Sequence, residues 1–266
     1  NWLNGQVAAA RNGKPFMLYL SHTSPHKPVI PLKRFRGKGN AGAYGEFMME
    51  TDWQVGRVLD WLDKNKLSDN TVVVFTSDNG PESTWRRRIE EYNHHSNGIY
   101  REGKRSIYEG GHRVPFFVRW PNKVKADSKW NLPVCQTDFL ATFADMLGKK
   151  LPENSGEDSV SFYRALTGQV APKRLAMIHH GMRGRYAVRE GKWKLIMERE
   201  RKDAKRELYN LSTDPGEVKN LIMKHPDVAK RLVKSITEII QNGRTTPGRP
   251  QKNDTAIWSD LYWMLD

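Results

Sequence analysis

The chain of 266 residues has one cysteine, Cys135, and no long hydrophobic run. One cysteine excludes an intrachain disulfide and a zinc site built from several cysteines. The longest apolar runs, at residues 16–20 and 72–75, are far shorter than the roughly 18–20 residues that cross a bilayer, so the sequence predicts no membrane span. Glycine and proline, at 21 and 14 residues, are near average usage, which excludes collagen-like and low-complexity chains.

Acidic residues are scarce relative to basic ones. The 30 Asp and Glu residues face 44 Lys and Arg residues, which leaves a net charge of +14 and favours anionic ligands. Nucleic acid is the least favoured polyanion, because the chain has no recognition motif and no basic helix with interleaved aromatics. The first residue is Asn1 and no leader-like segment follows, so we expect the gene product to begin upstream.

Strand and helix patterns alternate in the first half of the chain. The apolar run at 15–21 predicts a buried strand, and the β-branched run at 71–76 predicts a strand covered on both faces, as in a parallel sheet. Residues 45–65 between them have the periodicity of an amphipathic helix. The apolar stripe of that helix consists of Val55, Val58, Leu59 and Leu62.

The next segments continue this alternation. Residues 85–105 are polar and without a clear period, which indicates a long loop that can hold a short helix. A strand is predicted at 114–120 and a helix at 132–147. The apolar face of that helix consists of Leu140, Phe143, Ala144 and Leu147. The order of elements favours an α/β fold.

The pattern changes after residue 148. Short runs separated by glycine and charge predict a small antiparallel sheet, so we place a boundary between a core at 1–170 and a subdomain at 171–266. Residues 226–242 predict a helix with a stripe of Val228, Leu232, Ile236, Ile239 and Ile240. An extended strap follows, and its aromatic end at 258–265 is expected to dock on the core.

Asp78 and Asn79 directly follow the strand predicted at 71–76, where ligand sites collect in α/β sheets. A carboxylate and an amide carbonyl are hard oxygen donors that suit Ca²⁺ or Mg²⁺. The alternative is plain turn chemistry, since Asn79 precedes Gly80 and Asn-Gly is a strong turn signal.

Two histidines lie in the loop after the first predicted strand. His26 is held between prolines, and a histidine so placed could protonate a leaving oxygen near neutral pH. The alternative for His26 is an ordinary loop residue, and His22 is a weaker candidate.

Lys104 follows a glycine and precedes a glycine-rich turn, where a lysine can bind an oxyanion as a compact charge. The alternative is solvated surface, which is also the favoured interpretation for Arg86–Arg88 and for His94 and His95.

Three segments, in this order and spacing, resemble type I sulfatases of the alkaline phosphatase superfamily: PFMLYLSHTSPHKP, TVVVFTSDNGP and GKRSIYEGGHRVP. The downstream segments REGKWKLI and ELYNLSTDPGEVKNL are similar to the C-terminal subdomain of that family. The resemblance implies a mixed sheet flanked by helices, incomplete in this chain, followed by a small antiparallel sheet with a helix.

The resemblance also implies an activity, the hydrolysis of sulfate esters by a formylglycine nucleophile with Ca²⁺ on the sulfate oxygens. By position, Asp78 and Asn79 are the implied metal ligands, Lys104 binds sulfate, and His26 contacts or protonates the leaving oxygen. His22 is implied to lie behind these groups. The implied substrate is a sulfated small molecule or polysaccharide, and the implied location is the periplasm, the extracellular space or the lysosome.

One departure from the family concerns the nucleophile. The Cys-x-Pro-Ser-Arg signature is absent, because Cys135 is followed by Gln136-Thr137-Asp138, and so is the early acidic pair that completes the metal shell. We therefore expect the missing N-terminal half of the same protein to supply them, and we expect this chain alone to be inactive. The alternatives are a phosphonate monoester or phosphodiester hydrolase of the same superfamily, and a non-catalytic homologue that binds sulfated glycans.

Overall fold

The computed structural model describes residues 2–182, 184–197, 205–255 and 259–264. The chain forms two compact units that interleave along the sequence. The first contains residues 1–76, 83–96 and 115–126, and the second contains residues 77–82, 97–114 and 127–266. The boundary expected near residue 170 lies inside the second unit and stays a prediction. No helix among the described residues is long and apolar enough to cross a membrane.

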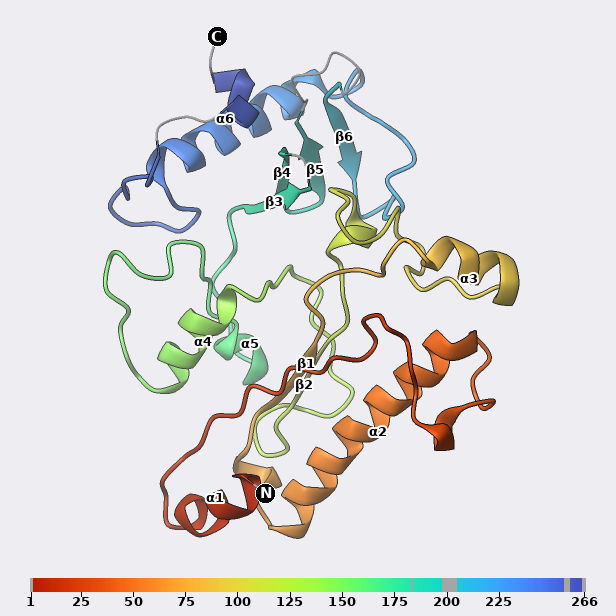
Figure 1. Ribbon diagram of the computed structural model, residues 1–266. Helices are drawn as coiled ribbons and strands as arrows, with labels where there is room; N and C mark the ends of the chain where they lie inside the picture. The colour runs from red at the N-terminus through yellow and green to blue at the C-terminus, as the bar shows by residue number, and fades with distance from the viewer. Residues whose placement is uncertain (1, 183, 198–204, 256–258, 265–266) are drawn as a thin grey trace. The chain divides into compact units, whose positions relative to one another are not determined.

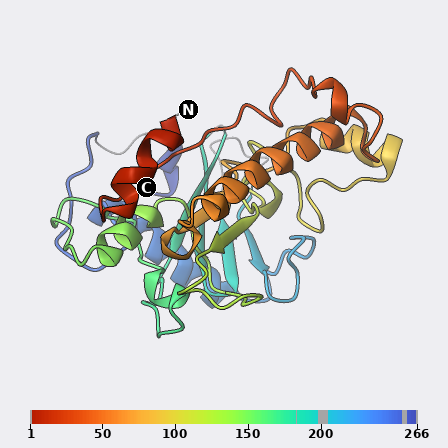
Figure 2. The ribbon, with the colours of Figure 1, turned by 90° about the horizontal axis from the view of Figure 1, so that it is seen from below.

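The first unit is organised by one long helix, α2 (Gly42–Lys64), which runs unbroken in Figure 2. Its bounds confirm the helix predicted at 45–65, and Leu62 of the predicted stripe is 2 % exposed. The N-terminal half of α2 also buries Glu46 and Glu50, whose carboxylates accept backbone N–H groups of Gly37 and Leu32. The other helices of this unit are α1 (Trp2–Arg11), η1 (Lys33–Phe35), η2 (Ser68–Asn70) and α3 (Trp85–Tyr92).

The sheet of the first unit has two strands, β1 (Val73–Thr76) and β2 (Phe116–Arg119). Both confirm predicted strands, but they pair antiparallel, with Val73 opposite Arg119. Every residue of β1 is half-buried, so the expectation of a strand covered on both faces is wrong for this chain.

The strand expected at 15–21 does not form. Met17 is 72 % exposed and Tyr19 is 86 % exposed. An apolar run can form a strand only beside a partner that takes its backbone hydrogen bonds, and the described residues provide none for this segment.

The second unit contains the predicted antiparallel sheet, with strand order β3-β4-β5-β6 (Figure 1). Each strand pairs antiparallel with the next strand along the chain. The helix α6 (Pro226–Asn242) packs its Leu232 and Ile236, both fully buried, against this sheet. It confirms the predicted bounds and stripe. The strands are β3 (Met177–Gly181), β4 (Arg185–Glu190), β5 (Trp193–Ile196) and β6 (Glu207–Asn210).

The helix expected at 132–147 begins only at residue 138, as α4 (Asp138–Met146). The Asp138 carboxylate accepts the backbone N–H groups of Cys135 and Val160, which folds the preceding residues into a turn. The expected apolar face is wrong at Leu140 and Leu147, which are 50 % and 70 % exposed. The buried side of α4 carries Asp138 and Thr142 instead, because their oxygens accept backbone N–H groups of a neighbouring loop. A one-turn helix, α5 (Tyr163–Leu166), follows.

The strap after α6 is not extended as expected: residues 245–249 bend, and the Gln251 backbone N–H donates back to the Asn242 carbonyl at 2.8 Å. The strap also bonds to the loop before α5. Thr246 donates through its hydroxyl to the Glu157 carbonyl at 2.6 Å. The final turn, η4 (Ser259–Met264), packs the fully buried Leu261 and the partly buried Trp263 into the core of α6 and the sheet. Docking is thus confirmed for these residues, whereas Trp258 and Leu265 lie outside the described residues.

Candidate functional site

Two loops that carry predicted site residues are joined by backbone hydrogen bonds within the second unit. The Gly80 N–H donates to the Gly111 carbonyl at 2.9 Å, and the Lys104 N–H donates to the Pro81 carbonyl at 2.8 Å. A Cβ atom at Gly80 would lie 1.8 Å from the Gly110 oxygen, so only glycine permits this approach. The loop of Asp78 and Asn79 is therefore fixed against the segment that contains Lys104.

The Asp78 and Asn79 side chains present oxygen atoms at the end of β1. Asp78 is exposed, and its carboxylate makes no hydrogen bond or ion pair with the described residues. The Asn79 amide nitrogen donates to the Gly80 carbonyl at 3.0 Å, which leaves its carbonyl oxygen free to accept a cation. Oxygen donors of these two types are the ones that Ca²⁺ or Mg²⁺ prefers, and a complete shell would need further donors.

His26 lies in the first unit, on the loop that precedes η1. It is exposed, and one ring nitrogen lies 2.8 Å from the Lys27 carbonyl oxygen. The loop is tied to α2 in two places. The buried Thr51 hydroxyl donates to Ser24 at 2.8 Å, and His22 lies 2.6 Å from the Gln54 amide oxygen. His22 thus braces the loop that carries His26.

Cys135 shows no sign of an activated thiol. Its sulfur lies 2.9 Å from the Thr137 hydroxyl, and burial raises its pKa, which keeps the thiol protonated. Cys135 is therefore a poor nucleophile.

A buried charge cluster that the sequence analysis missed lies where the turn η3 (Glu109–Gly111) meets the sheet of the second unit. Glu109 and Lys194 are 1 % and 0 % exposed, and the Lys194 ammonium lies 2.9 Å from a carboxylate oxygen of Glu109 and of Glu217. Glu217 also accepts the Glu109 backbone N–H at 2.5 Å. One lysine thus joins the glycine-rich turn after Lys104 to the strand β5.

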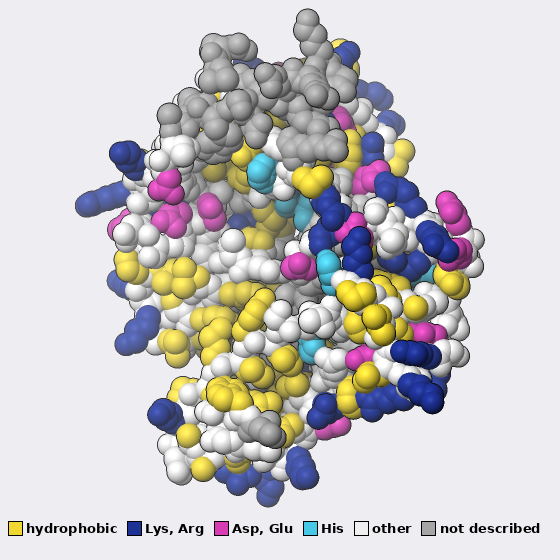
Figure 3. Space-filling model, viewed as in Figure 1, with side chains coloured by type: hydrophobic (Ala, Val, Ile, Leu, Met, Phe, Trp, Pro, Cys, Tyr) yellow, Lys and Arg dark blue, Asp and Glu magenta, His cyan; other side chains and the backbone are white. Residues whose placement is uncertain are grey.

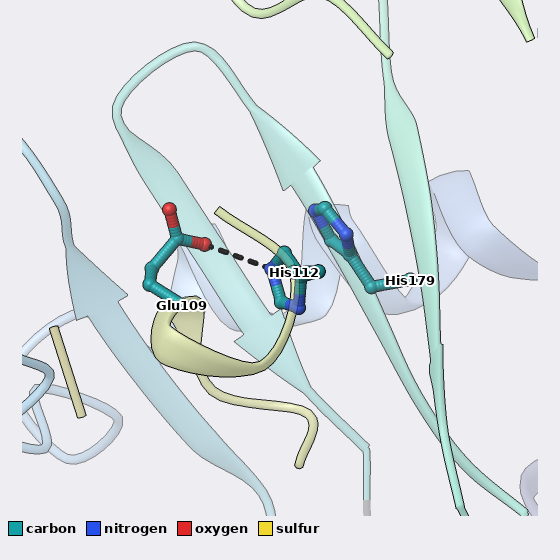
Figure 4. Close-up of side chains that lie close together, drawn as sticks. All are labelled: Glu109, His112 and His179. Carbon is teal, nitrogen blue, oxygen red and sulfur yellow. Dashed lines mark hydrogen bonds and ion pairs between the residues drawn. The ribbon is translucent and has the colours of Figure 1, made fainter. Parts of the chain in front are cut away.

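Two stacked histidines complete this cluster, which we call the Glu109 network and define as Glu109, His112, His179, Lys194 and Glu217. The rings of His112 and His179 are 4.1 Å apart, and His112 bonds the Glu109 carboxylate at 3.2 Å (Figure 4). The His179 ring comes from β3, and its Nε2 atom is buried without a hydrogen-bond partner among the described residues.

The charges of the Glu109 network are set by burial and by neighbouring groups. Burial opposes ionisation of Glu109, but the hydrogen bond from His112 and the charge of Lys194 hold the pKa of Glu109 well below its usual value. Burial raises the pKa of Glu217, which has fewer cations around it. Burial also lowers the pKa of His112, and more strongly that of His179, so both imidazoles are neutral at pH 7.

The nitrogen and oxygen atoms of Glu109, His112 and His179 lie within 4.8 Å of one another, as in a metal site. However, the Glu109 carboxylate already pairs with Lys194 at 2.9 Å and with Arg189 at 3.4 Å. A divalent ion here would be repelled by both cations. The geometry therefore favours a structural role, in which the network holds the Lys104 loop on the sheet.

Because these imidazoles resist protonation when folded, acid should destabilise the protein. Their unfolded pKa is near 6.5, so the stability they contribute is present above that value and is lost as the pH falls through it toward the lowered folded values. We expect the melting temperature of the full-length protein to fall between pH 7.5 and pH 5, as measured by circular dichroism. The raised pKa of Glu217 acts in the opposite direction.

The variant His179→Phe keeps a ring in the stack and removes one proton-binding site. Its melting temperature should therefore depend less on pH than that of the parent. The control is His95→Gln, on an exposed loop residue. An unchanged pH dependence in His179→Phe would refute this assignment of the acid sensitivity.

One sequence signal could have revealed the Glu109 network. Lys194 stands between Trp193 and Leu195 in an apolar strand, where a lysine needs a buried acidic partner. Its partners Glu109 and Glu217 are distant in sequence, so the pairing emerges only from the fold.

Two protein-family models match the chain, and together they cover residues 2–243. A family model described as Sulfatase matches residues 2–149. A second model, described as N-sulphoglucosamine sulphohydrolase, C-terminal, matches residues 98–243.

Individual relatives agree with these models. The chain is 35 % identical over 248 residues to an N-acetylgalactosamine-6-O-sulfatase of Bacteroides thetaiotaomicron, which covers 87 % of this chain and 48 % of the relative. It is 37 % identical over 155 residues to human steryl-sulfatase, which covers 58 % of this chain and 27 % of that protein. The chain thus spans about half or less of the length of these relatives.

A solved structure from work on the metabolism of multiple glycosaminoglycans by Bacteroides thetaiotaomicron superposes with a TM-score of 0.78 at 32 % identity. That match covers 89 % of this chain and 53 % of the other. A protein solved in complex with its substrate D-glucosamine-2-N,6-O-disulfate superposes with a TM-score of 0.59 at 26 % identity, over 74 % of this chain and 39 % of the other. The chain therefore belongs to the sulfatase family and has the α/β fold of its members.

Proposed function

We propose that the protein to which this chain belongs hydrolyses sulfate esters of a glycan. The observation that carries this proposal is the glycine-locked contact between the loop of Asp78 and Asn79 and the segment of Lys104, in a chain that matches the sulfatase family. Two relatives, an N-acetylgalactosamine-6-O-sulfatase and a protein solved with a disulfated glucosamine as its substrate, support a sulfated sugar as the substrate. Export to the periplasm, the extracellular space or the lysosome is part of the same proposal.

Each predicted residue has a role in that reaction. Lys104 places a positive charge on a sulfate oxygen and stabilises the charge that develops there. His26, whose imidazole is exposed, donates a proton to the alcohol oxygen as it leaves. Asp78 and Asn79 hold a divalent cation through their oxygens, and that cation when bound polarises the sulfate group. No residue of this chain is assigned as the nucleophile, for which we expect a formylglycine in the missing N-terminal half of the same protein.

The metal assignment predicts that Asp78→Ala lowers the Ca²⁺ affinity of the full-length protein by at least about 100-fold, because it removes a charged ligand. Isothermal titration calorimetry measures the affinity directly. The control is Asp69→Ala, which removes an exposed carboxylate of η2 and should bind Ca²⁺ as the parent does. Unchanged affinity in Asp78→Ala would remove the metal assignment.

A further inference from the structure

A basic surface in the first unit has no place in the reaction described above. The first 45 residues contain no Asp or Glu, but they contain Lys and Arg at positions 11, 14, 27, 33, 34, 36 and 38. The densest part is the segment KRFRGK at residues 33–38, which includes η1. Figure 3 shows dark blue side chains gathered at the lower right, in the region of η1 and α2.

Two arginines of this surface are held on one aromatic ring. The Arg34 guanidinium lies 3.4 Å from the centroid of the Trp53 ring, and the Arg57 guanidinium lies 4.8 Å from it. Phe35 packs beside Trp53 at 6.1 Å between ring centroids. Stacking on an indole restricts both side chains, so an anion that binds them has less conformational entropy to remove.

The two buried carboxylates of α2 do not pair with these arginines. Glu46 and Glu50 on α2 are buried and accept the backbone N–H groups of Gly37 and Leu32, at 2.6 Å and 2.8 Å. Within the described part of the chain, neither Arg34 nor Arg57 forms an ion pair. Both arginines are exposed, so an anion can reach their guanidiniums from solvent.

We propose that this surface, formed by Lys33, Arg34, Lys38, Trp53 and Arg57, binds a sulfated polysaccharide chain outside the reaction centre. The proposal rests on the proposed function and extends it from a sulfated sugar to a polymer. The guanidinium fork fits the oxygens of a sulfate group, and the surface follows directly along the chain from the loop of His26. A nucleic acid fits less well, because the ring of Trp53 is already occupied by guanidiniums and offers no platform for a base.

The test compares polymer binding with turnover of a small ester in the full-length protein. The double variant Arg34→Glu/Arg57→Glu should bind chondroitin sulfate at least about fivefold more weakly and with a smaller salt dependence. Its kcat/KM for p-nitrophenyl sulfate should equal that of the parent. The matched control is Lys149→Glu/Lys150→Glu, which makes the same charge change at exposed residues after α4.

The possible results separate the two proposals. Equal losses in the double variant and the control would overturn the surface, because net charge alone would then explain them. Single-stranded DNA that binds as tightly as chondroitin sulfate, with the same dependence on Arg34 and Arg57, would overturn the assignment to a glycan. If the parent turns over no sulfate ester, but Arg34→Glu/Arg57→Glu still loses polymer binding and the control does not, the binding surface is supported and the proposed hydrolysis is contradicted. The variant Arg34→Lys/Arg57→Lys keeps both positive charges but removes the forked guanidinium donors. Its affinity for chondroitin sulfate should lie between those of the parent and of the double glutamate variant.

Discussion

Replacing Lys104 by methionine should lower kcat/KM of the full-length protein for a sulfate ester by about 10²–10³-fold, because one preformed charge on a developing oxyanion contributes about that much. Methionine keeps the length and apolar stem of the side chain and removes only the ammonium group. The Lys104 backbone N–H, which donates to Pro81, is unaffected, so the loop should keep its position. Release of sulfate, followed by ion chromatography, gives the rate.

The control for this variant is Lys150→Met, an exposed lysine after α4, which should retain parental activity. Circular dichroism should show the same melting temperature for Lys104→Met and the parent. Parental turnover in a folded Lys104→Met protein would contradict the role given to this ammonium.

Lys194→Met should cause the largest loss of stability among single changes in the Glu109 network. The ammonium is fully buried and pairs with both Glu109 and Glu217, so its removal leaves two buried carboxylates with one shared cation fewer. Removing one partner of such a group costs about 3–5 kcal/mol. We expect the melting temperature of the full-length protein to fall by on the order of 10 °C.

Two further variants identify the cause. Lys230→Met, on the exposed side of α6, should melt with the parent. Adding Glu217→Gln to Lys194→Met should restore part of the loss, because it removes one of the uncompensated charges. A Lys194→Met protein that is as stable as the parent would show that the network does not hold the Lys104 loop on the sheet.

The sequence predicts best where the pattern is local. The helix α6 forms at its predicted bounds because its apolar stripe repeats at helical spacing over the whole segment. The four strands of the second unit were also recognised, since glycines and charges separate them and antiparallel neighbours follow in order.

Prediction fails where a distant partner decides the structure. The run at 15–21 is apolar enough for a strand, but a strand also needs a neighbour, and hydrophobicity does not say whether one exists. The face of α4 was wrong at Leu140 because Asp138 and Thr142 turn toward backbone donors that lie 20 or more residues away.

The candidate site was found only in part for the same reason. Asp78, Asn79 and Lys104 stand in short motifs that a resemblance can recognise, and their assigned roles stay predictions. The Glu109 network is not predicted because Glu109 and Lys194 are 85 residues apart, so their pairing emerges only from the fold.

The central claim is that the full-length protein hydrolyses sulfate esters, and the most direct measurement is kcat/KM for a sulfate ester and for a phosphonate monoester with the same leaving group. The account predicts that the sulfate ester is the better substrate and that Lys104→Met lowers its turnover. A preference for the phosphonate monoester, or no sulfate release at all from a folded, Ca²⁺-loaded protein, would contradict it.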